Sequence, residues 1–528
     1  MSDISTSYVE PGVYVQYQDA QVPAAPASVL IPVIIGEGKR TISISETVTR
    51  AGTGNLDTLA HSPLFSISSI TDRPGTVYTS GTDFTVTMSS GVINWIGTAP
   101  AALSDYQVEY TYEKGAADYA PYTTTRMEDI VALFGPAQYT SNIATSTVST
   151  TATVGLFTVW TSATYTLNQY AGNYIRITSG SGKGQERLIV SNVLNSATLT
   201  VYPAWSVQLD NTSVYEINDI STNTLAIGAQ LAISQGASYI MCVQLQDNIS
   251  SATTGWQAAM DALELQECYC VVPMRGLDTT STPESTILNY LKTHVTDMST
   301  MVERKFRMAL IGVPIGTTTT AAFISIATLC DSERMAVLTP DTMDLTLNGV
   351  TETVDGSYLA ASVAGIICNP NYTWGEPISG KSVIPFDDIV DPFTRTEKNM
   401  MAGNGVMIIE KKGPGDFRIR HALTTNPSTV AEQELKVTRI KDGLSKYMIS
   451  SLESAFINTR NVGNETISNI KAFMKFLLSN VISRQDITEF SDPDVRVSPS
   501  DPRQINISFN VRPSYDVNYI KITFGVSL

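Results

Sequence analysis

Charged side chains are scarce in this sequence. Asp, Glu, Lys and Arg make up 16% of the 528 residues, against about 25% in an average globular domain. Because 43% of the residues are apolar, the low charge does not indicate disorder, which requires low hydrophobicity together with high net charge. The chain is therefore expected to fold, and its length allows about three or four domains.

Basic residues are fewer still. The chain has 34 Lys and Arg against 50 Asp and Glu, a net charge of −16, which argues against nucleic-acid binding that depends on neutralising phosphates. The deficit is uneven. Residues 416–528 carry 14 basic and 12 acidic residues, a net of +2, while the other 415 residues carry 20 and 38, a net of −18. We therefore expect the C-terminal region to face a different partner from the rest of the chain.

Residues suited to catalysis or metal binding are also rare. The three histidines stand in unrelated contexts: His61 before a β module, His294 in an expected helix and His421 after a strand. No Gly-x-Ser-x-Gly nucleophile elbow is present. The five cysteines are odd in number and lack the CxxC spacing of zinc and redox sites. We expect no catalytic, cofactor or metal site, and buried free thiols in a reducing compartment.

Two glycine-rich segments have structural explanations. Residues 375–382 match the P-loop pattern letter for letter, but turn residues precede them and Pro385 follows where a helix should begin. We therefore expect no nucleotide site there. The segment 179–184 lies between expected strands and is interpreted as a hairpin turn.

Long hydrophobic runs are missing as well. No stretch approaches the roughly 18 apolar residues that span a bilayer. The opening Met1-Ser2-Asp3 lacks the basic and apolar regions of a signal peptide. The sequence predicts a protein made in a cytoplasm, with no membrane insertion.

Strand patterns dominate the first half of the chain. Within residues 1–20, Val13, Val15 and Tyr17 alternate with Tyr14 and Gln16, and no hairpin partner is close in sequence. This segment is interpreted as an arm that pairs with a distant segment or another chain. Glycine-punctuated short runs predict a sandwich-like β module at 41–118. Further strand-like runs at 174–178, 187–190, 198–202 and 213–217 predict a second β module at 145–218.

Residues 221–420 change to alternating strands and helices. Apolar strands separated by helices of ten or more residues predict βαβ units and a parallel sheet, and so an α/β core. The strand-like runs are 239–245, 268–273, 308–314 and 335–339, and the helix-like runs are 256–267, 285–304, 321–330 and 358–368.

Residues 421–528 are expected to form an α+β domain. Its first helix, at 429–458, begins with the capping box Thr429-x-x-Glu432. A second amphipathic helix follows, and then two strands with alternating apolar residues. The alternating sets are Ile505, Ile507, Phe509 and Val511, then Ile520, Ile522, Phe524 and Val526.

Three basic residues of the first helix form a possible docking strip. Lys436, Arg439 and Lys446 fall on one arc opposite the apolar stripe of this helix. One interpretation is a solvated face whose lysines pair with acidic residues at i,i+4 spacing. The other is a basic strip that docks an acidic partner.

Three passages resemble the contractile-tail sheath proteins of phages. The sharpest is Tyr8-Val-Glu-Pro-Gly-Val-Tyr-Val15. The second is Gly413-Pro-Gly-Asp-Phe-Arg-Ile-Arg-His-Ala-Leu-Thr-Thr425, followed by Val437-Thr-Arg-Ile-Lys-Asp442. The third is Val511-Arg-Pro, followed by Ile520-Lys-Ile-Thr-Phe524. Their order and spacing make the resemblance specific.

This resemblance implies a structural polymer rather than an enzyme. The expected fold is a subtilisin-like α/β core without protease activity, with inserted all-β modules, an α+β C-terminal domain and strand arms at both ends. Subunits would form stacked hexameric rings around a tail tube, in a virion tail assembled in the host cytoplasm, and would contract to drive the tube through the host envelope for genome delivery. Baseplate and tail-terminator proteins are further expected partners, and no cofactor is implied.

The resemblance also assigns roles to residues. Lys436, Arg439 and Lys446 become candidates for facing the tube. The arms become intersubunit strands, so that deleting 1–18 or 505–528 should leave a folded subunit that no longer polymerises. The arm candidates are Val13, Tyr14, Val15 and Tyr17, then Ile520, Ile522, Phe524 and Val526.

Three alternatives stay open. One is the sheath of a phage-derived contractile injection particle. A second is a subtilisin-like hydrolase, which would need a catalytic trio. A third is a static surface or adhesion protein built on the β modules.

Overall fold

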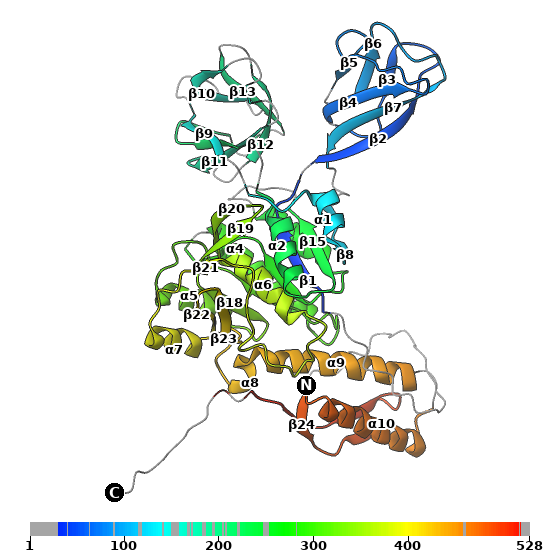
Figure 1. Ribbon diagram of the computed structural model, residues 1–528. Helices are drawn as coiled ribbons and strands as arrows, with labels where there is room; N and C mark the ends of the chain where they lie inside the picture. The colour runs from blue at the N-terminus through cyan, green and yellow to red at the C-terminus, as the bar shows by residue number, and fades with distance from the viewer. Residues whose placement is uncertain are drawn as a thin grey trace.

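The chain folds into four parts (Figure 1). Two β modules lie at one end, an α/β core in the middle, and a C-terminal unit with two long helices at the other end. The computed structural model describes residues 30–39, 41–62, 64–87, 90–114, 119–139, 142–148, 158–165, 169–170, 173–181, 186–192, 196–202, 205, 208–218, 222–245, 253–280, 282–457, 461–516 and 518.

The centre of the core is an eight-stranded sheet. Its strands are β1 (Pro32–Gly36), β8 (Tyr122–Thr124), β15 (Ile240–Gln244), β16 (Cys270–Pro273), β17 (Met308–Ile311), β18 (Met335–Thr339), β22 (Val406–Gly413) and β23 (Asp416–His421). The spatial order is β23-β22-β18-β17-β16-β1-β15-β8, with the six inner strands parallel and the two edge strands antiparallel. The inner strands are continuous apolar runs because both faces of the sheet are covered.

Strand β1 occupies the middle of this sheet, although the sequence placed the core in residues 221–420. Ile34 of β1 lies opposite Cys242 of β15 on one side and Val272 of β16 on the other. The first β module therefore interrupts the core between β1 and β8, and the second interrupts it between β8 and β15. A five-residue run such as Pro32–Gly36 carries no sequence signal for partners so far along the chain.

Helices cover both faces of the sheet, and alternate residues of β1 point to each face. Ile34 packs with one set of helices, and Val33 and Ile35 pack with the other. Four of the helices match those expected from the sequence, with ends shifted by up to six residues. On the Ile34 face lie α1 (Met127–Phe134), α2 (Thr224–Ser234) and α6 (Gly356–Ile367), and on the other face lie α3 (Thr254–Leu263), α4 (Thr282–Met298), α5 (Thr320–Cys330) and α7 (Arg395–Gly403).

A small three-stranded sheet sits beside the core. Strands β19 (Thr342–Leu347) and β20 (Val350–Asp355) form a hairpin, and β21 (Asp388–Ile389) pairs with β19. The two turn residues, Asn348 and Gly349, have φ values of 51° and 82°. Asn-Gly is the preferred pair for such a turn, because it tolerates positive φ at both positions.

The first β module consists of two three-stranded sheets around an aromatic core. Buried Asp57 organises this core, because Trp95 Nε1 and Tyr106 Oη donate to its Oδ2 at 2.7 and 2.9 Å. The module starts and ends on paired neighbours, Thr41 and Glu113. One sheet contains β2 (Thr41–Thr49), β7 (Asp105–Glu113) and β4 (Leu64–Asp72), and the other contains β3 (Leu56–Thr58), β6 (Val92–Trp95) and β5 (Phe84–Thr87).

The second β module is a single six-stranded antiparallel sheet, and it contains the four strands expected there from the sequence. Its first and last strands are neighbours, with Asn142 opposite Asn218, so the chain enters and leaves the module at adjacent points. In spatial order the strands are β10 (Thr158–Tyr165), β13 (Ser196–Tyr202), β12 (Glu186–Asn192), β11 (Tyr174–Ser179), β14 (Val214–Asn218) and β9 (Asn142–Thr147).

The C-terminal unit begins with two helices where one was expected. Helix α8 (Val430–Gln433) is separated from α9 (Leu435–Phe456) by Glu434, which is extended, with φ −79° and ψ 110°. The helix breaks because this stretch pairs with the segment after β23: the Leu435 amide donates to Ala422 O at 3.2 Å. The expected capping interaction is present, since the Glu432 amide donates to Thr429 Oγ1 at 3.2 Å.

Helix α10 (Asn464–Ser483) and two short strand pairs complete this unit. Strand β24 (Ile487–Phe490) pairs with β27 (Val511–Pro513), and β25 (Asp494–Val497) pairs with β26 (Ile505–Ser508). The apolar residues of β26 and β27 pack in the same cluster as α9 and α10. Residues 505–513 therefore belong to the packed unit, so the deletion of 505–528 considered from the sequence would also remove part of this cluster. Among the described residues, none of the helices combines the length and apolarity needed to cross a membrane.

Candidate functional site

An α/β sheet usually binds ligands at its topological switch point, where neighbouring strands continue to opposite faces. Here that point lies between β1, which leads to α2, and β16, which leads to α4. Protein atoms pack closely around Gly36, the last residue of β1. The Glu37 amide donates to Thr224 Oγ1 at 2.9 Å, and a Cβ added to Gly36 would lie 3.0 Å from the Leu225 amide and 3.1 Å from Met274 Cβ. The end of β1 therefore leaves no room for a side chain at this position.

The three histidines lie in three separate environments. The His61 ring stacks on Tyr112 with centroids 4.1 Å apart. His421 Nε2 lies 2.8 Å from Glu434 Oε1, at the end of β23. His294 Nε2 lies 2.6 Å from Arg307 Nη1 in the core, and burial together with the Arg307 charge lowers the pKa of His294 to about 4. His294 is therefore neutral near pH 7 and accepts a hydrogen bond from Arg307.

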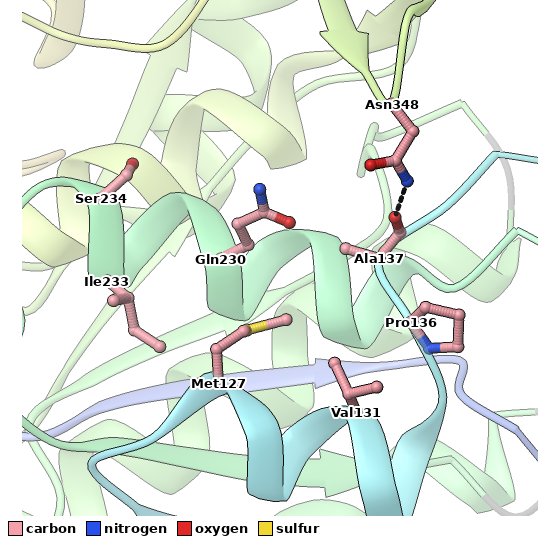
Figure 2. A pocket seen from close by; sticks show the side chains of 8 residues that line it. All are labelled: Met127, Val131, Pro136, Ala137, Gln230, Ile233, Ser234 and Asn348. Atoms are coloured by element: carbon pink, nitrogen blue, oxygen red, sulfur yellow. Dashed lines mark hydrogen bonds between the residues drawn. The ribbon is translucent and has the colours of Figure 1, made fainter.

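A cavity of about 410 Å³ opens between α1, α2 and the tip of the β19–β20 hairpin (Figure 2). Asn348 Nδ2 donates to Ala137 O at 3.2 Å across one end of it. Its walls carry no ionisable side chain, so they offer neither a general acid nor a base. The lining residues are Met127, Val131, Pro136, Ala137, Gln230, Ile233, Ser234 and Asn348.

The P-loop-like segment is a contact between the core and the C-terminal unit. The Gly375 amide donates to Asp486 Oδ1 at 2.6 Å, and Lys381 pairs with Glu376 at 2.7 Å. Ser382 forms a bridge with Arg418 of β23, so β pairing follows the loop where a P-loop requires a helix. The loop amide and the lysine that would hold phosphate thus have protein partners.

All five cysteines are buried free thiols. Burial raises the pKa of Cys242 to about 12 and that of Cys268 to about 11. Thiols with such pKa values are poor nucleophiles at neutral pH, because the reactive form is the thiolate. The described part of the chain has no group of three or more His, Cys, Asp or Glu side chains that could hold a metal ion.

Two of the three basic-strip candidates are buried, so the expectation that they project freely from α9 is wrong. Lys436 is 5% exposed and Arg439 is 1% exposed. Lys446 is half-buried and lies 3.0 Å from Glu267. The physical reason is that α9 lies between the core and α10 (Figure 1), so the face opposite its apolar stripe also packs on protein.

The other basic residues of the C-terminal region also have local partners. Apart from Arg439, every described Lys and Arg in residues 416–518 lies within 4 Å of a carboxylate oxygen. The excess positive charge of this region therefore does not form an unpaired basic surface on the described residues. The i,i+4 partners expected for the lysines are not used, because Lys436 pairs with Asp516 instead.

Arg439 belongs to the junction between the core and the C-terminal unit, which sequence reasoning missed. Its Nη1 and Nη2 donate to Glu376 O and Thr373 O at 3.2 and 3.1 Å, and burial lowers its pKa. Trp374, between these two carbonyl groups, inserts into the apolar cluster of α9 and α10. The junction therefore combines an apolar anchor with hydrogen bonds from a buried cation.

A second polar cluster holds the same helix to the core. Arg334 donates to both carboxylate oxygens of Asp442 at 2.9 and 3.0 Å, and Tyr269 Oη donates to Asp442 Oδ2 at 3.1 Å. Burial raises the pKa of Asp442, and Arg334 opposes that rise. Nothing in the amphipathic pattern of α9 distinguishes Asp442 from a surface residue.

The arm candidates lie outside the described residues. This holds for Val13, Tyr14, Val15 and Tyr17 at one end and for Ile520, Ile522, Phe524 and Val526 at the other. Strands on which such arms could add are present in the described chain, because β24 to β27 each have a single strand partner within it.

Comparison with known proteins adds the following. A family described as "Domain of unknown function (DUF4815)" matches residues 2–144. The chain is 22% identical over 308 residues to the tail sheath protein of Mycobacterium phage Bxz1, a match that covers 57% of this chain and 51% of that protein. The chain thus spans about half the length of the curated relative that it matches.

Two solved structures are also similar. The helical sheath of the anti-feeding prophage in its contracted state has a TM-score of 0.44 at 11% identity, covering 58% of this chain and 83% of that one. The sheath tail protein of Desulfitobacterium hafniense has a TM-score of 0.41 at 9% identity, covering 95% and 100%. The named relatives are structural sheath proteins and not enzymes, and the resemblance to sheath proteins is confirmed.

Proposed function

We propose that this chain is the structural subunit of a contractile tail sheath. The observation that carries the proposal is the similarity to a phage tail sheath protein, which extends over 57% of this chain. Close packing around Gly36 at the end of β1, and a cavity without ionisable groups, agree with a structural role.

The finer proposal concerns the assembly. Copies form stacked hexameric rings around a tail tube, end on baseplate and tail-terminator proteins, and contract to push the tube through the host envelope. In this proposal the core is the subtilisin-like domain of the sheath, which its parallel sheet between two helical layers supports, and the β modules are insertions in it. Support for the insertions comes from the paired ends of each module, Thr41 with Glu113 and Asn142 with Asn218.

Strand exchange would link the subunits. The two strand pairs of the C-terminal unit support this. Each of these strands is paired along one edge, and its other edge has no strand partner among the described residues. Such edges accept an added strand through main-chain hydrogen bonds. The alternating segments near both chain ends, around Val13–Tyr17 and Ile520–Val526, provide strands of suitable pattern.

Electron microscopy of the purified protein tests the proposal. We expect rings or long tubes from the full chain, and folded but unassembled subunits after deletion of residues 1–18 or 519–528. As a matched control, removal of residues 142–218 with the ends rejoined should leave assembly intact, because Asn142 and Asn218 are already neighbours. A full chain that stays monomeric under all assembly conditions, including with its tube, would contradict the proposal.

One alternative keeps the same structural role. This alternative is the sheath of an injection particle. The likeness to the anti-feeding prophage sheath concerns the fold alone. The genes adjacent to this one would distinguish the two, because a phage tail requires capsid and genome-packaging proteins.

A further inference from the structure

An ion pair between Lys436 and Asp516 is buried at the start of α9. Lys436 Nζ lies 2.6 Å from Asp516 Oδ1, and the two side chains are only 7% and 10% exposed. A cation in the first turn of a helix is unfavourable for the helix dipole, and burial of an unpaired ammonium group is costly. A lysine at this place is therefore explained by its partner, which lies 80 residues later, just beyond β27.

The neighbouring residues of that segment also bind the body. The amide and hydroxyl of Ser514 both donate to Asp486 O, at 3.2 and 3.1 Å. Asn518 Nδ2 donates to Glu434 Oε1 at 3.2 Å and also lies 3.2 Å from His421 Nε2. Residues 514, 516 and 518 thus alternate, as they do in an extended chain that keeps one side toward the protein.

The contacts form a path from one unit to another. Asp486 immediately precedes β24 in the C-terminal unit. Glu434 and Lys436 lie at the start of α9, and His421 is the last residue of β23 in the core sheet. Between two of these contacts, Tyr515 is 46% exposed. The segment is therefore held by alternate side chains rather than by burial of its whole surface.

We propose that His421, Glu434 and Lys436 form a C-terminal anchor, which fixes the position of residues 514–518 on the body and so the point from which the last ten residues start. The value of the anchor for assembly rests on the proposed function, in which these residues reach a neighbouring subunit. Fixing the start of a binding segment reduces the conformational entropy lost when the segment binds. Lys436, expected from the sequence to face the tube, is then a positioning residue for the arm.

Limited chymotrypsin digestion of the full-length protein tests the anchor. Cleavage after Tyr515 requires release of residues 514–518, whereas the bond after Phe524 lies six residues beyond Asn518 and is an internal control. We expect Asp516→Asn to increase the initial rate of cleavage after Tyr515 by about tenfold or more, since a buried lysine then lacks its charged partner. The rate after Phe524 should stay within about twofold.

Two further variants keep the test decisive. Asp501→Asn removes a neighbouring ion pair in which Arg503 is 86% exposed, and it should leave both rates unchanged. The exchanged pair Lys436→Asp with Asp516→Lys should restore protection of Tyr515. If Asp516→Asn leaves cleavage after Tyr515 at the rate of the unaltered protein, the anchor is refuted. Assembly by a chain lacking residues 519–528 would instead count against the proposed strand exchange alone, because the digestion is measured on subunits.

Discussion

Replacement of Gly443 by Ala should loosen the junction between the core and the C-terminal unit. Gly443 lies within α9, where alanine is normally the better residue by about 1 kcal/mol. A Cβ at this position, however, would lie 2.2 Å from Cδ2 and 2.4 Å from Cε2 of Trp374. Carbon atoms do not approach so closely, so the indole ring has to move by more than about 1 Å.

The size of the effect follows from what Trp374 loses. Its ring is 6% exposed and lies under the guanidinium group of Arg484, 4.3 Å from the ring centroid. Strained overpacking costs about 1–3 kcal/mol, and loss of a buried tryptophan side chain costs about 3–5 kcal/mol. After subtraction of the helix-propensity gain, expulsion of the ring should lower the free energy of unfolding by about 2–4 kcal/mol.

Equilibrium urea unfolding followed by far-UV circular dichroism measures this change. The matched control is Gly403→Ala, at the last residue of α7, where an added Cβ would meet no atom within 4 Å. That control should be neutral or stabilising by up to about 1 kcal/mol. The same helix-favouring substitution should therefore have opposite signs at the two positions.

A double-mutant cycle identifies the clash as the cause. In a Trp374→Ala background, Gly443→Ala should become neutral or slightly stabilising, which gives a coupling of about 2 kcal/mol or more. If Gly443→Ala is as harmless as Gly403→Ala, or as harmful without Trp374 as with it, the packing argument is wrong.

Three further substitutions test buried polar groups. The pKa of His294 is about 4 in the folded protein, so the free energy of unfolding falls as the pH drops from 6.5 toward 4 and the unfolded chain takes up a proton at this residue. His294→Gln keeps an acceptor for Arg307 and should abolish about 3 kcal/mol of this loss, as measured by urea unfolding at several pH values. Burial and a hydrogen bond raise the pKa of Tyr78 to about 12, so Tyr78→Phe should flatten the fall in melting temperature between pH 10 and 12. Asp57→Ala leaves buried Arg50 without its carboxylate and should destabilise the first β module by about 3–5 kcal/mol, measured by thermal unfolding.

Local patterns in the sequence predicted the elements well. The apolar run at 335–339 coincides with β18, and the strand-like run at 198–202 falls within β13. These signals depend on side chains within one element, which the sequence contains in full. The same holds for the capping residues Thr429 and Glu432.

Features that depend on distant partners could not be predicted in the same way. Lys436 and Arg439 follow the helical pattern of solvent-facing residues, but both are buried by distant parts of the chain. Arg439 packs against the segment 373–376, and Lys436 pairs with Asp516. The strands at 505–513 have the same alternation as the segment 520–526, and the pattern does not tell which of them completes a hairpin. Tertiary packing, rather than local preference, decides such cases.

The central position of β1 also determines the order in which the chain can fold during synthesis. This strand leaves the ribosome early, but its partners, β15 and β16, begin at Ile240 and Cys270. At about 5–20 residues per second, the roughly 200 intervening residues take about 10–40 s to synthesise. Both β modules can fold in this interval, because their strand pairings are internal, whereas Pro-Val-Ile-Ile-Gly remains an apolar strand without its neighbours. The length of the two modules thus sets a delay, during which this apolar strand is made but unpaired and is prone to aggregation.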